Sequence, residues 1–519
     1  MSRRETLEAL SGLLLVLFVA MISATIVSVA LPQIVGSLNG TQAQYTWVVT
    51  ASLLASTATT PIWGKLADLF SKKLLIQIAV VFFMLGSLAC GLAQSTGQLI
   101  GFRVIQGLGM GALQVLVQVV IAAMISPKER GRYNGYLGAV MAVATVAGPL
   151  LGGLIADTSW LGWRWCFFIA VPFCIAAFLL LSKTLHIADV RRTDVKIDYL
   201  GATLIAAGVS LLLIWVTFVD NDFDWISWQT GAMVGGSLVL LALAVWVESR
   251  VPAPIVPLRI IVRRTPALSI LASLAVGMAM FGGAVFLGQY FQIGRGYTPT
   301  EAGLLTIPMM AGVLFSSTIS GRMISKSGVV KPYIITGLVV LTLGFAGLST
   351  LDHETPLWFV MLAMAAVGIG VGMSMQNLML VLQNTVPLHE LGAASGALTF
   401  FRSLGGTIGV SVLGAILANR VATGIAEGLA KMGIKPSASS GRSSLNLEAL
   451  PEPIKLIVRA AYGDATGHIF LVSIGIALLG LIAALFLPRV RLRDTLDLAP
   501  AADDDAGTAP AATARADAN

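Results

Sequence analysis

The feature that most constrains this chain is a series of apolar runs, each about 20 residues long, separated by short charged or turn-rich breaks. A helix needs about 20 mostly apolar residues to cross the hydrocarbon of a bilayer, because each residue rises about 1.5 Å. Only 11% of the residues are charged, against roughly 25% in a soluble domain. The runs therefore predict an integral membrane protein made of helices, which satisfy their backbone groups within each segment.

Fourteen such runs occur, and they predict an all-α integral membrane fold with fourteen transmembrane helices. The predicted spans lie near residues 11–34, 45–64, 75–94, 98–122, 134–156, 164–183, 199–218, 230–247, 267–290, 301–321, 332–350, 357–381, 395–418 and 467–487.

Basic residues concentrate in every second connecting segment, whereas the short segments between them contain few. By the positive-inside rule this distribution predicts a multi-pass protein with both termini in the cytoplasm. The plasma membrane is its expected location. The net charge of +7 does not indicate nucleic-acid binding, because the basic residues form short clusters between apolar runs.

An internal sequence similarity indicates two related halves. The segment "GKLADLFSKK" (64–73) follows the second span, and the similar segment "GRMISKSGVVK" (321–331) follows the tenth. Two duplicated halves with a site near the membrane midplane are typical of secondary transporters. We therefore expect a six-plus-two-plus-six arrangement of spans. Its segments are a cytoplasmic N-terminus (1–10), an N-terminal six-helix half (11–183), a linker with two extra spans at 199–218 and 230–247 (184–265), a C-terminal half with a long outer loop at 419–466 (266–487), and a disordered cytoplasmic tail (488–519).

Several motifs carry a family resemblance. "GKLADLFSKK" resembles the loop motif of the major facilitator superfamily, "RVIQGLGMGA" (103–112) its fourth-helix motif, and "GPLLGG" (148–153) the fifth-helix motif of its antiporters. "WRWCFFIAVP" (163–172) and residues 380–410 resemble the fourteen-span drug:proton antiporters in particular. The resemblance implies a multidrug efflux transporter of the major facilitator fold.

The loop motif is expected to act as a latch between helices. Asp68 can accept hydrogen bonds from the N-terminal amides of a neighbouring helix, and Gly64 permits a tight helix contact. Lys72 and Lys73 either complete the latch or serve only as topology signals. The family implies that the latch stabilises the outward-open state, although Leu69 and Ser71 replace the usual arginine and glycine.

The antiporter motif places small residues on one helix face, because Ala144, Gly148, Gly152 and Ala156 recur every four residues. Such a face lets a second helix pack closely and move against it. Pro149 adds a bend and Gly153 completes the motif. Small-residue packing of the kind found in any membrane bundle is the alternative interpretation.

Polar side chains of several spans are candidates for a substrate cavity. Arg103, Gln106, Met110, Gln114 and Gln118 form one stripe on the fourth span, and a charge in such a place is costly unless it faces a partner or water. Anchoring of Arg103 at the outer membrane surface is the alternative. The remaining candidates are Ser23, Thr25 and Ser28 in the first span, with Gln289, Gln376, Asn377 and Gln383 in later spans.

The expected proton carrier is missing from the first span, since Ser23 occupies the position where the resembling antiporters have an aspartate. Proton coupling needs a group whose charge changes, commonly a buried carboxylate, and no aspartate or glutamate falls in the middle of a span. The candidates that remain are Arg103, Asp157 and Glu301, and a helix cap or solvated charge is the alternative for the two acids.

These observations predict a monomeric exporter of drug-like or amphipathic small molecules that works by alternating access in the lipid bilayer, with protons as the expected counter-substrate. The rivals are an exporter of lipid or of one metabolite with weak or absent proton coupling, and a membrane ligand-binding or scaffold protein that does not transport. No Walker, CxxC or HExxH pattern occurs, so we expect neither an enzyme nor a cofactor nor a metal site.

Overall fold

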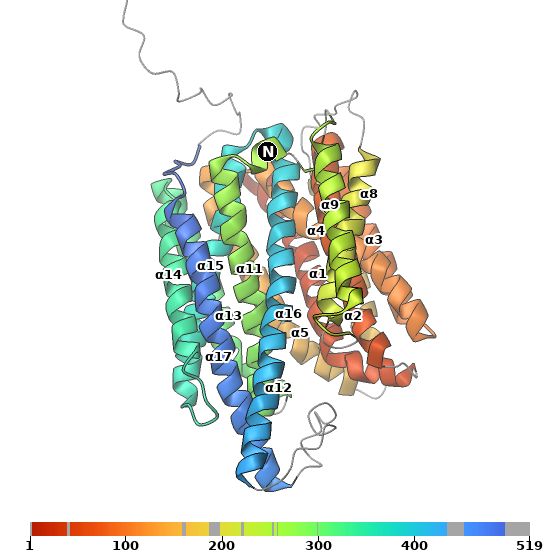
Figure 1. Cartoon of the computed structure of the whole chain (residues 1–519). Helices are drawn as coiled ribbons and strands as arrows, with labels where there is room; N and C mark the ends of the chain where they lie inside the picture. Colours follow the sequence, from red (N-terminus) through yellow and green to blue (C-terminus); the bar gives the residue numbers. More distant parts are fainter. Residues whose placement is uncertain are drawn as a thin grey trace, which may run out of the picture.

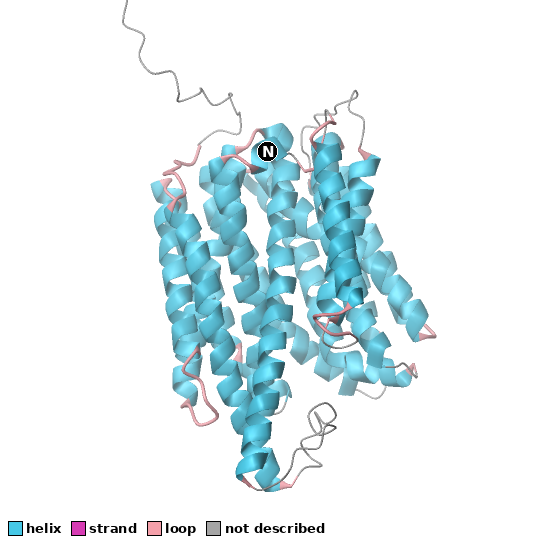
Figure 2. Ribbon diagram, in the orientation of Figure 1, coloured by secondary structure: helices cyan, strands magenta, loops and turns pink. Residues whose placement is uncertain are grey.

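Each of the fourteen predicted ranges is mostly helical in the computed structural model (Figure 1), and two of them, 164–183 and 301–321, each cover two consecutive helices. The structure describes residues 3–38, 42–157, 162–185, 198–219, 223–251, 254–256, 258–297, 299–432 and 451–493. Within these residues the regular structure is entirely helical (Figure 2).

The helices fall into three groups along the chain. The first contains α1 (Arg3–Ser37), α2 (Gln42–Leu69), α3 (Lys72–Leu92), α4 (Thr96–Met124), α5 (Pro127–Asp157), α6 (Trp165–Phe168) and α7 (Ala170–Thr184). The second contains α8 (Tyr199–Phe218) and α9 (Trp228–Glu248). The third contains α10 (Leu258–Ile261), α11 (Arg264–Gln289), the π-helical turn η1 (Tyr290–Gly294), α12 (Pro299–Leu305), α13 (Ile307–Ser327), α14 (Lys331–Leu348), α15 (Leu357–Thr385), the 3₁₀ turn η2 (Leu388–Glu390), α16 (Leu391–Lys431) and α17 (Glu452–Leu485).

The number of helices able to cross a membrane differs from the prediction. In the described part of the chain, twelve helices are long and apolar enough to span. Helices α2 and α5 are not among them, because α2 is rich in serine and threonine and several side chains of α5 lie outside the described ones. The predicted count of fourteen spans is therefore not confirmed.

Short polar side chains determine where several of these helices begin. Ser71 Oγ accepts a hydrogen bond from the third amide of α3, and Ser95 Oγ does the same for α4. Asp198 and Ser227 cap α8 and α9 in the same way. Because the first amides of a helix have no intrahelical acceptor, each cap fixes the first turn after a break between apolar runs.

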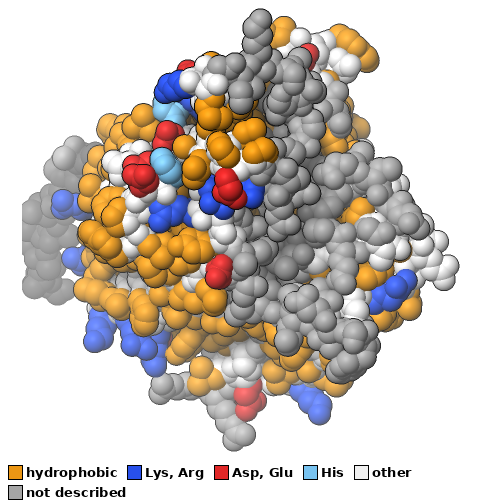
Figure 3. Space-filling model, turned by 90° about the horizontal axis from the view of Figure 1, so that it is seen from below, with side chains coloured by type: hydrophobic (Ala, Val, Ile, Leu, Met, Phe, Trp, Pro, Cys, Tyr) orange, Lys and Arg blue, Asp and Glu red, His pale blue; other side chains and the backbone are white. Residues whose placement is uncertain are grey.

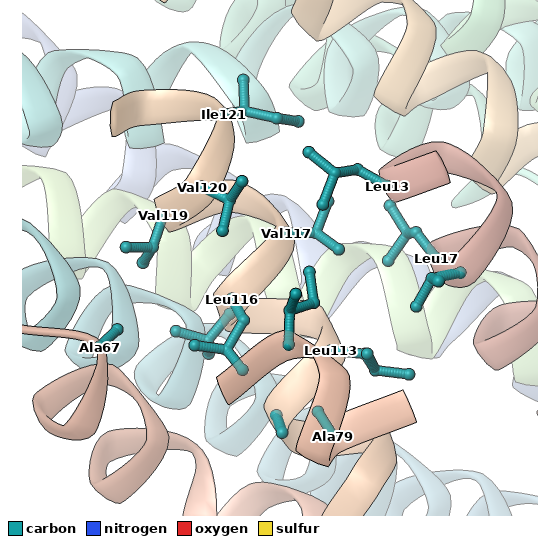
Figure 4. Close-up of a cluster of buried hydrophobic side chains, with 14 of the residues drawn as sticks. Leu13, Leu17, Ala67, Ala79, Leu113, Leu116, Val117, Val119, Val120 and Ile121 are labelled. Atoms are coloured by element: carbon teal, nitrogen blue, oxygen red, sulfur yellow. The ribbon is translucent and has the colours of Figure 1, made fainter. Parts of the chain in front are cut away.

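Two large hydrophobic cores hold the bundle together. One is built mainly from α1 to α5 and α7, and Figure 4 shows part of it, where Leu13 and Leu17 of α1 lie beside Leu113 and Val117 of α4. The second is built mainly from α11 to α17. Helices α8 and α9 pack on each other and beside α2 (Figure 1), and a smaller apolar cluster joins them to α2 and α16.

The first and last described residues lie at the same end of the bundle (Figure 1), which we call the N-terminal end. The C-terminus of α2 and the N-terminus of α16 also lie there, since the two meet through hydrogen bonds. The opposite, far end shows acidic, basic and histidine side chains mixed among hydrophobic ones (Figure 3).

The segment 419–466, predicted as a long loop, is helical in nearly all of its described residues. Helix α16 continues to Lys431 and α17 begins at Glu452, so both helices extend well beyond the predicted spans. They can pack together there because Gly424 faces Ala461 and Gly428 faces Ile457, leaving room for close contact. Three stretches lie outside the described residues: 433–450, the part of the predicted linker (184–265) at 186–197, and the part of the predicted tail (488–519) from 494 onward.

Candidate functional site

Asp68 links the two halves at the N-terminal end of the bundle. Its carboxylate is buried at the end of α2, where Oδ1 accepts a hydrogen bond from the Gly392 amide at 2.7 Å and Oδ2 accepts one from the Ala393 amide at 2.8 Å. Both amides belong to the first turn of α16, where donors lack helical acceptors and the helix dipole favours a negative charge. The hydrogen bonds expected for Asp68 from the sequence are thus present.

The same contact explains why glycine occurs at position 64. A Cβ atom at Gly64 would meet the carbonyl oxygen of Gly392, and a Cβ atom at Gly392 would meet both Gly64 and the Asp68 carboxylate. Backbone-to-backbone contact of α2 with α16 therefore requires glycine on each side.

The two lysines of the predicted latch have different surroundings. Lys73 Nζ donates to the carbonyl oxygen of Ser182 at 2.7 Å, which joins α3 to the end of α7 within one half. A lysine at a helix C-terminus satisfies an open carbonyl and complements the helix dipole. Lys72 lies close enough to Asp68 for its charge to act on the carboxylate. The Lys73 contact therefore does not bridge the halves.

A second link between the halves was missed from the sequence. Arg130, buried at the start of α5, donates to the carbonyl oxygens of Ile125 and Ala122 at 2.9 and 2.6 Å, and to Gln383 Oε1 of α15 at 3.0 Å. Gln383 Nε2 in turn donates to Ser395 Oγ of α16 at 3.0 Å. Gln383, predicted to line the substrate cavity, lies instead in this chain of contacts at the N-terminal end.

The segment that follows α17 adds a third link. Asn384 of α15 donates to the Arg491 carbonyl oxygen at 3.2 Å and accepts from the Arg493 amide at 3.1 Å. The Arg493 carbonyl oxygen accepts from the Lys128 amide in the first turn of α5 at 3.2 Å. Residues 491–493 therefore connect α15 of the second half to α5 of the first.

Removing the Gln383 side chain should destabilise the protein more than removing an exposed glutamine. In Gln383→Leu the buried Arg130 guanidinium loses an acceptor, which costs about 1–3 kcal/mol. We expect a lower thermal unfolding midpoint in detergent, whereas Gln289→Leu at an exposed site should leave the midpoint nearly unchanged. Equal midpoints for the two variants would contradict the buried contact.

Arg103 lies in a buried polar network of the first half. Its Nε donates to the Val48 carbonyl oxygen at 3.1 Å and its Nη1 donates to Gln106 Oε1 at 2.6 Å. Gln106 Nε2 donates to Ser87 Oγ at 2.8 Å and to Ser23 Oγ at 3.3 Å. In the described residues no carboxylate takes part in these contacts. The guanidinium donates to a backbone carbonyl and to a neutral amide, and that amide in turn donates to two hydroxyls.

The small-residue face of α5 packs against α1. Thr25 Oγ1 donates to the Ala144 carbonyl oxygen at 3.3 Å, and a Cβ atom at Gly148 would collide with Thr25 Oγ1. Gly152 faces the backbone of Ile26 in the same way. The side chains at 28, 149, 153 and 157 (Ser28, Pro149, Gly153 and Asp157 among the predicted site residues) lie outside the described ones.

The other cavity candidates do not gather at one place. Gln376 Nε2 lies 3.8 Å from Met141 Sδ of α5, a contact between the halves. Asn377 lies within the second half, where Nδ2 donates to the Met373 carbonyl oxygen at 2.6 Å. Met110, Gln114 and Gln118 are half-buried on α4, whereas Gln289 and Glu301 are exposed.

At the far end, a tight turn between α14 and α15 holds Asp352. The Thr355 hydroxyl donates to Asp352 Oδ1 at 2.7 Å, and the Glu354 amide donates to the same oxygen at 2.8 Å. These hydrogen bonds lower the pKa of the Asp352 carboxyl below its ordinary value. Asp352 therefore stays ionised at neutral pH.

Metal and thiol chemistry find no support in the described residues. No group of three or more His, Cys, Asp or Glu side chains is placed there to hold a metal ion. Cys90, Cys166 and Cys174 are free and buried, which is typical of packing residues.

Comparison with known proteins places these contacts in a family. The family model for the Major Facilitator Superfamily matches residues 13–410. The multidrug transporter protein MdtP of Bacillus subtilis is 35% identical over 408 residues, covering 79% of this chain and 74% of that protein. The efflux pump dotC of Dothistroma septosporum is 32% identical over 501 residues, covering 94% of this chain and 84% of that pump.

A solved structure supports the fold. The proton:xylose symporter XylE, bound to 6-bromo-6-deoxy-D-glucose, aligns with a TM-score of 0.62 at 15% sequence identity, covering 95% of this chain and 98% of that one. The helical architecture, the family match and the related sequences agree, and the chain belongs to the major facilitator superfamily.

Proposed function

We propose that this protein exports drug-like or amphipathic small molecules across the plasma membrane by alternating access, in exchange for protons and without enzymatic chemistry. The names of its relatives, a multidrug transporter and an efflux pump, support export of small molecules. Both cover most of the chain at more than 30% identity.

One observation carries the alternating-access part of this proposal, namely the Asp68 carboxylate of one half held on two amides of the other. These hydrogen bonds can be broken and remade as α2 and α16 separate. The first hydrophobic core also includes residues of the second half, among them Met379, Leu382 and Leu398, which such a movement would uncover. Two rigid bodies joined by separable contacts at one end are the elements that a rocking transporter requires.

The membrane arrangement we propose is fourteen spans as six plus two plus six, in a monomer with both termini in the cytoplasm. The halves would be residues 11–183 and 266–487, with α8 and α9 as the extra pair. Basic clusters near the N-terminal end support this orientation. In this orientation the Asp68 contact closes the cytoplasmic side, as expected for an outward-open state.

We propose a substrate cavity between the halves that is lined by uncharged groups, chiefly Met110, Gln114 and Gln118 of α4 with Gln376 of α15. The contact of Gln376 with Met141 supports this placement, because it joins the facing helices α15 and α5. Amides bind by hydrogen bonds and methionine adapts to different apolar shapes. Together with the buried Arg103, such a cavity should favour neutral or zwitterionic compounds over cations.

A second candidate is an exporter of lipid or of one metabolite with weak or absent proton coupling. The observation that favours it is the network around Ser23, where the partner of Gln106 is a hydroxyl that cannot exchange a proton near neutral pH. Asp157 and Glu301 remain proposed proton carriers beside Arg103.

The proposed function is tested by transport into and out of proteoliposomes with and without an imposed pH gradient, using one neutral and one cationic lipophilic dye. We expect the gradient to accelerate transport of the neutral dye several-fold, and Glu301→Gln and Asp157→Asn to show whether either acid is essential. Gradient-independent flux would favour the second candidate. Absence of any protein-dependent flux would exclude both.

Introducing the missing acid should change selectivity. In Ser23→Asp a carboxylate would lie beside Gln106 and offset the charge of Arg103, which is worth ~1.5 kcal/mol to a cation about 10 Å away at an effective dielectric constant of about 20. We expect the ratio of cationic to neutral dye transport to rise about tenfold. The uncharged isostere Ser23→Asn should leave the ratio unchanged, and an equal rise in both variants would refute the electrostatic explanation.

A further inference from the structure

Two buried carboxylates lie next to each other where α8 begins and α9 ends. Asp198 is the residue before α8, and its Oδ1 accepts a hydrogen bond from the Gly201 amide at 2.8 Å. Glu248 ends α9, and its Oε2 accepts from the Val256 amide at 3.1 Å. Asp198 is 8% exposed and Glu248 is 4% exposed, so both side chains are more than nine-tenths buried.

Each carboxylate has a second oxygen that the described residues leave without a hydrogen-bond partner, namely Asp198 Oδ2 and Glu248 Oε1. These two oxygens approach the same place, because a Cβ atom added at Gly201 would contact both of them. A buried carboxylate oxygen without a donor is costly, and two adjacent ionised carboxylates also repel each other. A single proton held between the two oxygens removes both costs.

One bound proton would balance the charges at the pair. Among the described residues, the charged groups that act on Glu248 are Asp198 and Lys65 of the neighbouring α2. The small apolar cluster that joins α8 and α9 to α2 and α16 includes Ile205 and Ile255. Two carboxylates, one lysine and one proton sum to zero charge, whereas loss of the proton leaves a net negative charge in an apolar setting.

We propose that Asp198 and Glu248 form a proton-binding site, in which one carboxyl group holds the proton and donates it to the free oxygen of the other. The proton comes from water at the N-terminal end of the bundle and returns there on release. No aspartate or glutamate lies in the middle of a predicted span. The pair therefore supplies a titratable acid that the spans themselves lack.

Its position connects the pair to the latch between the halves. Lys65 lies one helical turn before Asp68, and its charge acts on Asp68 as well as on Glu248. When the proton leaves, the pair carries two negative charges and attracts the Lys65 ammonium more strongly. The attraction between Lys65 and the Asp68 carboxylate is then weaker. This coupling to transport rests on the proposed function, whereas proton binding by the pair does not.

The site is tested by infrared difference spectroscopy of the purified full-length protein in lipid nanodiscs as the pH is raised. Burial raises the pKa of Asp68 to about 7, so that carboxyl contributes a band of its own. Beyond it we expect a second carbonyl band of a protonated carboxyl group, which disappears with one proton released from the pair. Glu248→Gln and Asp198→Asn should each remove this band, whereas Glu354→Gln, at a side chain that is 84% exposed, should retain it. A wild-type spectrum without the band, or a band unchanged in Glu248→Gln, would overturn the proposal.

A variant that keeps both acids tests the site even if Glu248→Gln and Asp198→Asn fail to fold. Lys65→Met removes the positive charge that favours the deprotonated pair, so the titration midpoint of the band should move to higher pH; an unmoved midpoint would overturn the assignment of the band to this pair. The measurement needs no substrate. Failure of dye transport would therefore leave it intact, and absence of the band would leave the proposed export function standing.

Discussion

Replacing Asp68 with alanine should open the N-terminal end of the bundle and abolish most transport. The carboxylate accepts two amide hydrogen bonds that exist only when α2 and α16 are in contact. Hydrogen bonds to a charged group contribute about 1.5–3 kcal/mol each, so losing both shifts the equilibrium against the closed state by roughly a hundredfold or more. Asp68→Asn keeps one acceptor and should have an intermediate effect.

The opening can be measured as a distance between spin labels at Phe70 and Ser327, two exposed positions of the two halves near the N-terminal end. The three native cysteines are first replaced by serine. We expect a longer and broader distance distribution in Asp68→Ala than in wild type. Glu129→Gln, which removes an exposed carboxylate from the start of α5, is the matched control and should show the wild-type distance. An unchanged distribution in Asp68→Ala would mean that the contact does not hold the halves together.

The positions of the helices and the kind of partner that Asp68 has could be predicted because both depend on local information. Apolar length fixes where a helix can span, and a carboxylate at the end of α2 needs the kind of donors that the start of another helix offers. The glycines at 64 and 148 also reveal close contacts, although the sequence does not say which helix approaches. The structure identifies these helices as α16 and α1.

The contact of Arg130 with Gln383 could not be predicted, since 253 positions separate the two residues. Gln383 was assigned to a cavity because it lies seven residues after Gln376 and so shares its helix face. Seven residues also advance about 10 Å along the axis, which takes Gln383 from the level of Met141 to the end of the bundle. Periodicity shows which face of a helix a side chain occupies, but it does not show which partner lies opposite that side chain along the helix axis.

The same limit applies to the extra helix pair. Asp198 and Glu248 each resemble an ordinary helix end in the sequence, a cap before α8 and the last residue of α9. Only the packing of α8 on α9 brings their unpartnered oxygens together beside Gly201. Acidic residues at span ends therefore have to be judged by what the fold places next to them.

Replacing Arg103 and Gln106 together by methionine should abolish transport while preserving the fold. In Arg103→Met alone, Gln106 Oε1 and the Val48 carbonyl oxygen lose their donor, and each unsatisfied buried group costs about 1–3 kcal/mol. The double variant also removes the Gln106 acceptor, and the hydroxyls of Ser23 and Ser87 can donate to carbonyls one turn back in their own helices. The thermal midpoint should therefore fall in the single variant and largely recover in the double.

Transport of the neutral dye should not recover in the double variant, even though the thermal midpoint does. A buried cation retained without a carboxylate partner is expected to serve function rather than stability, because an apolar side chain of similar size would stabilise the bundle equally well. We expect dye flux in Arg103→Met/Gln106→Met to remain at least about tenfold below wild type. Gln77→Met, which removes a half-buried amide bonded to Ser182 between α3 and α7, is the control for loss of an interhelical hydrogen bond and should keep its flux. If flux returned together with the thermal midpoint in the double variant, the network would be structural and the cavity would have to lie elsewhere.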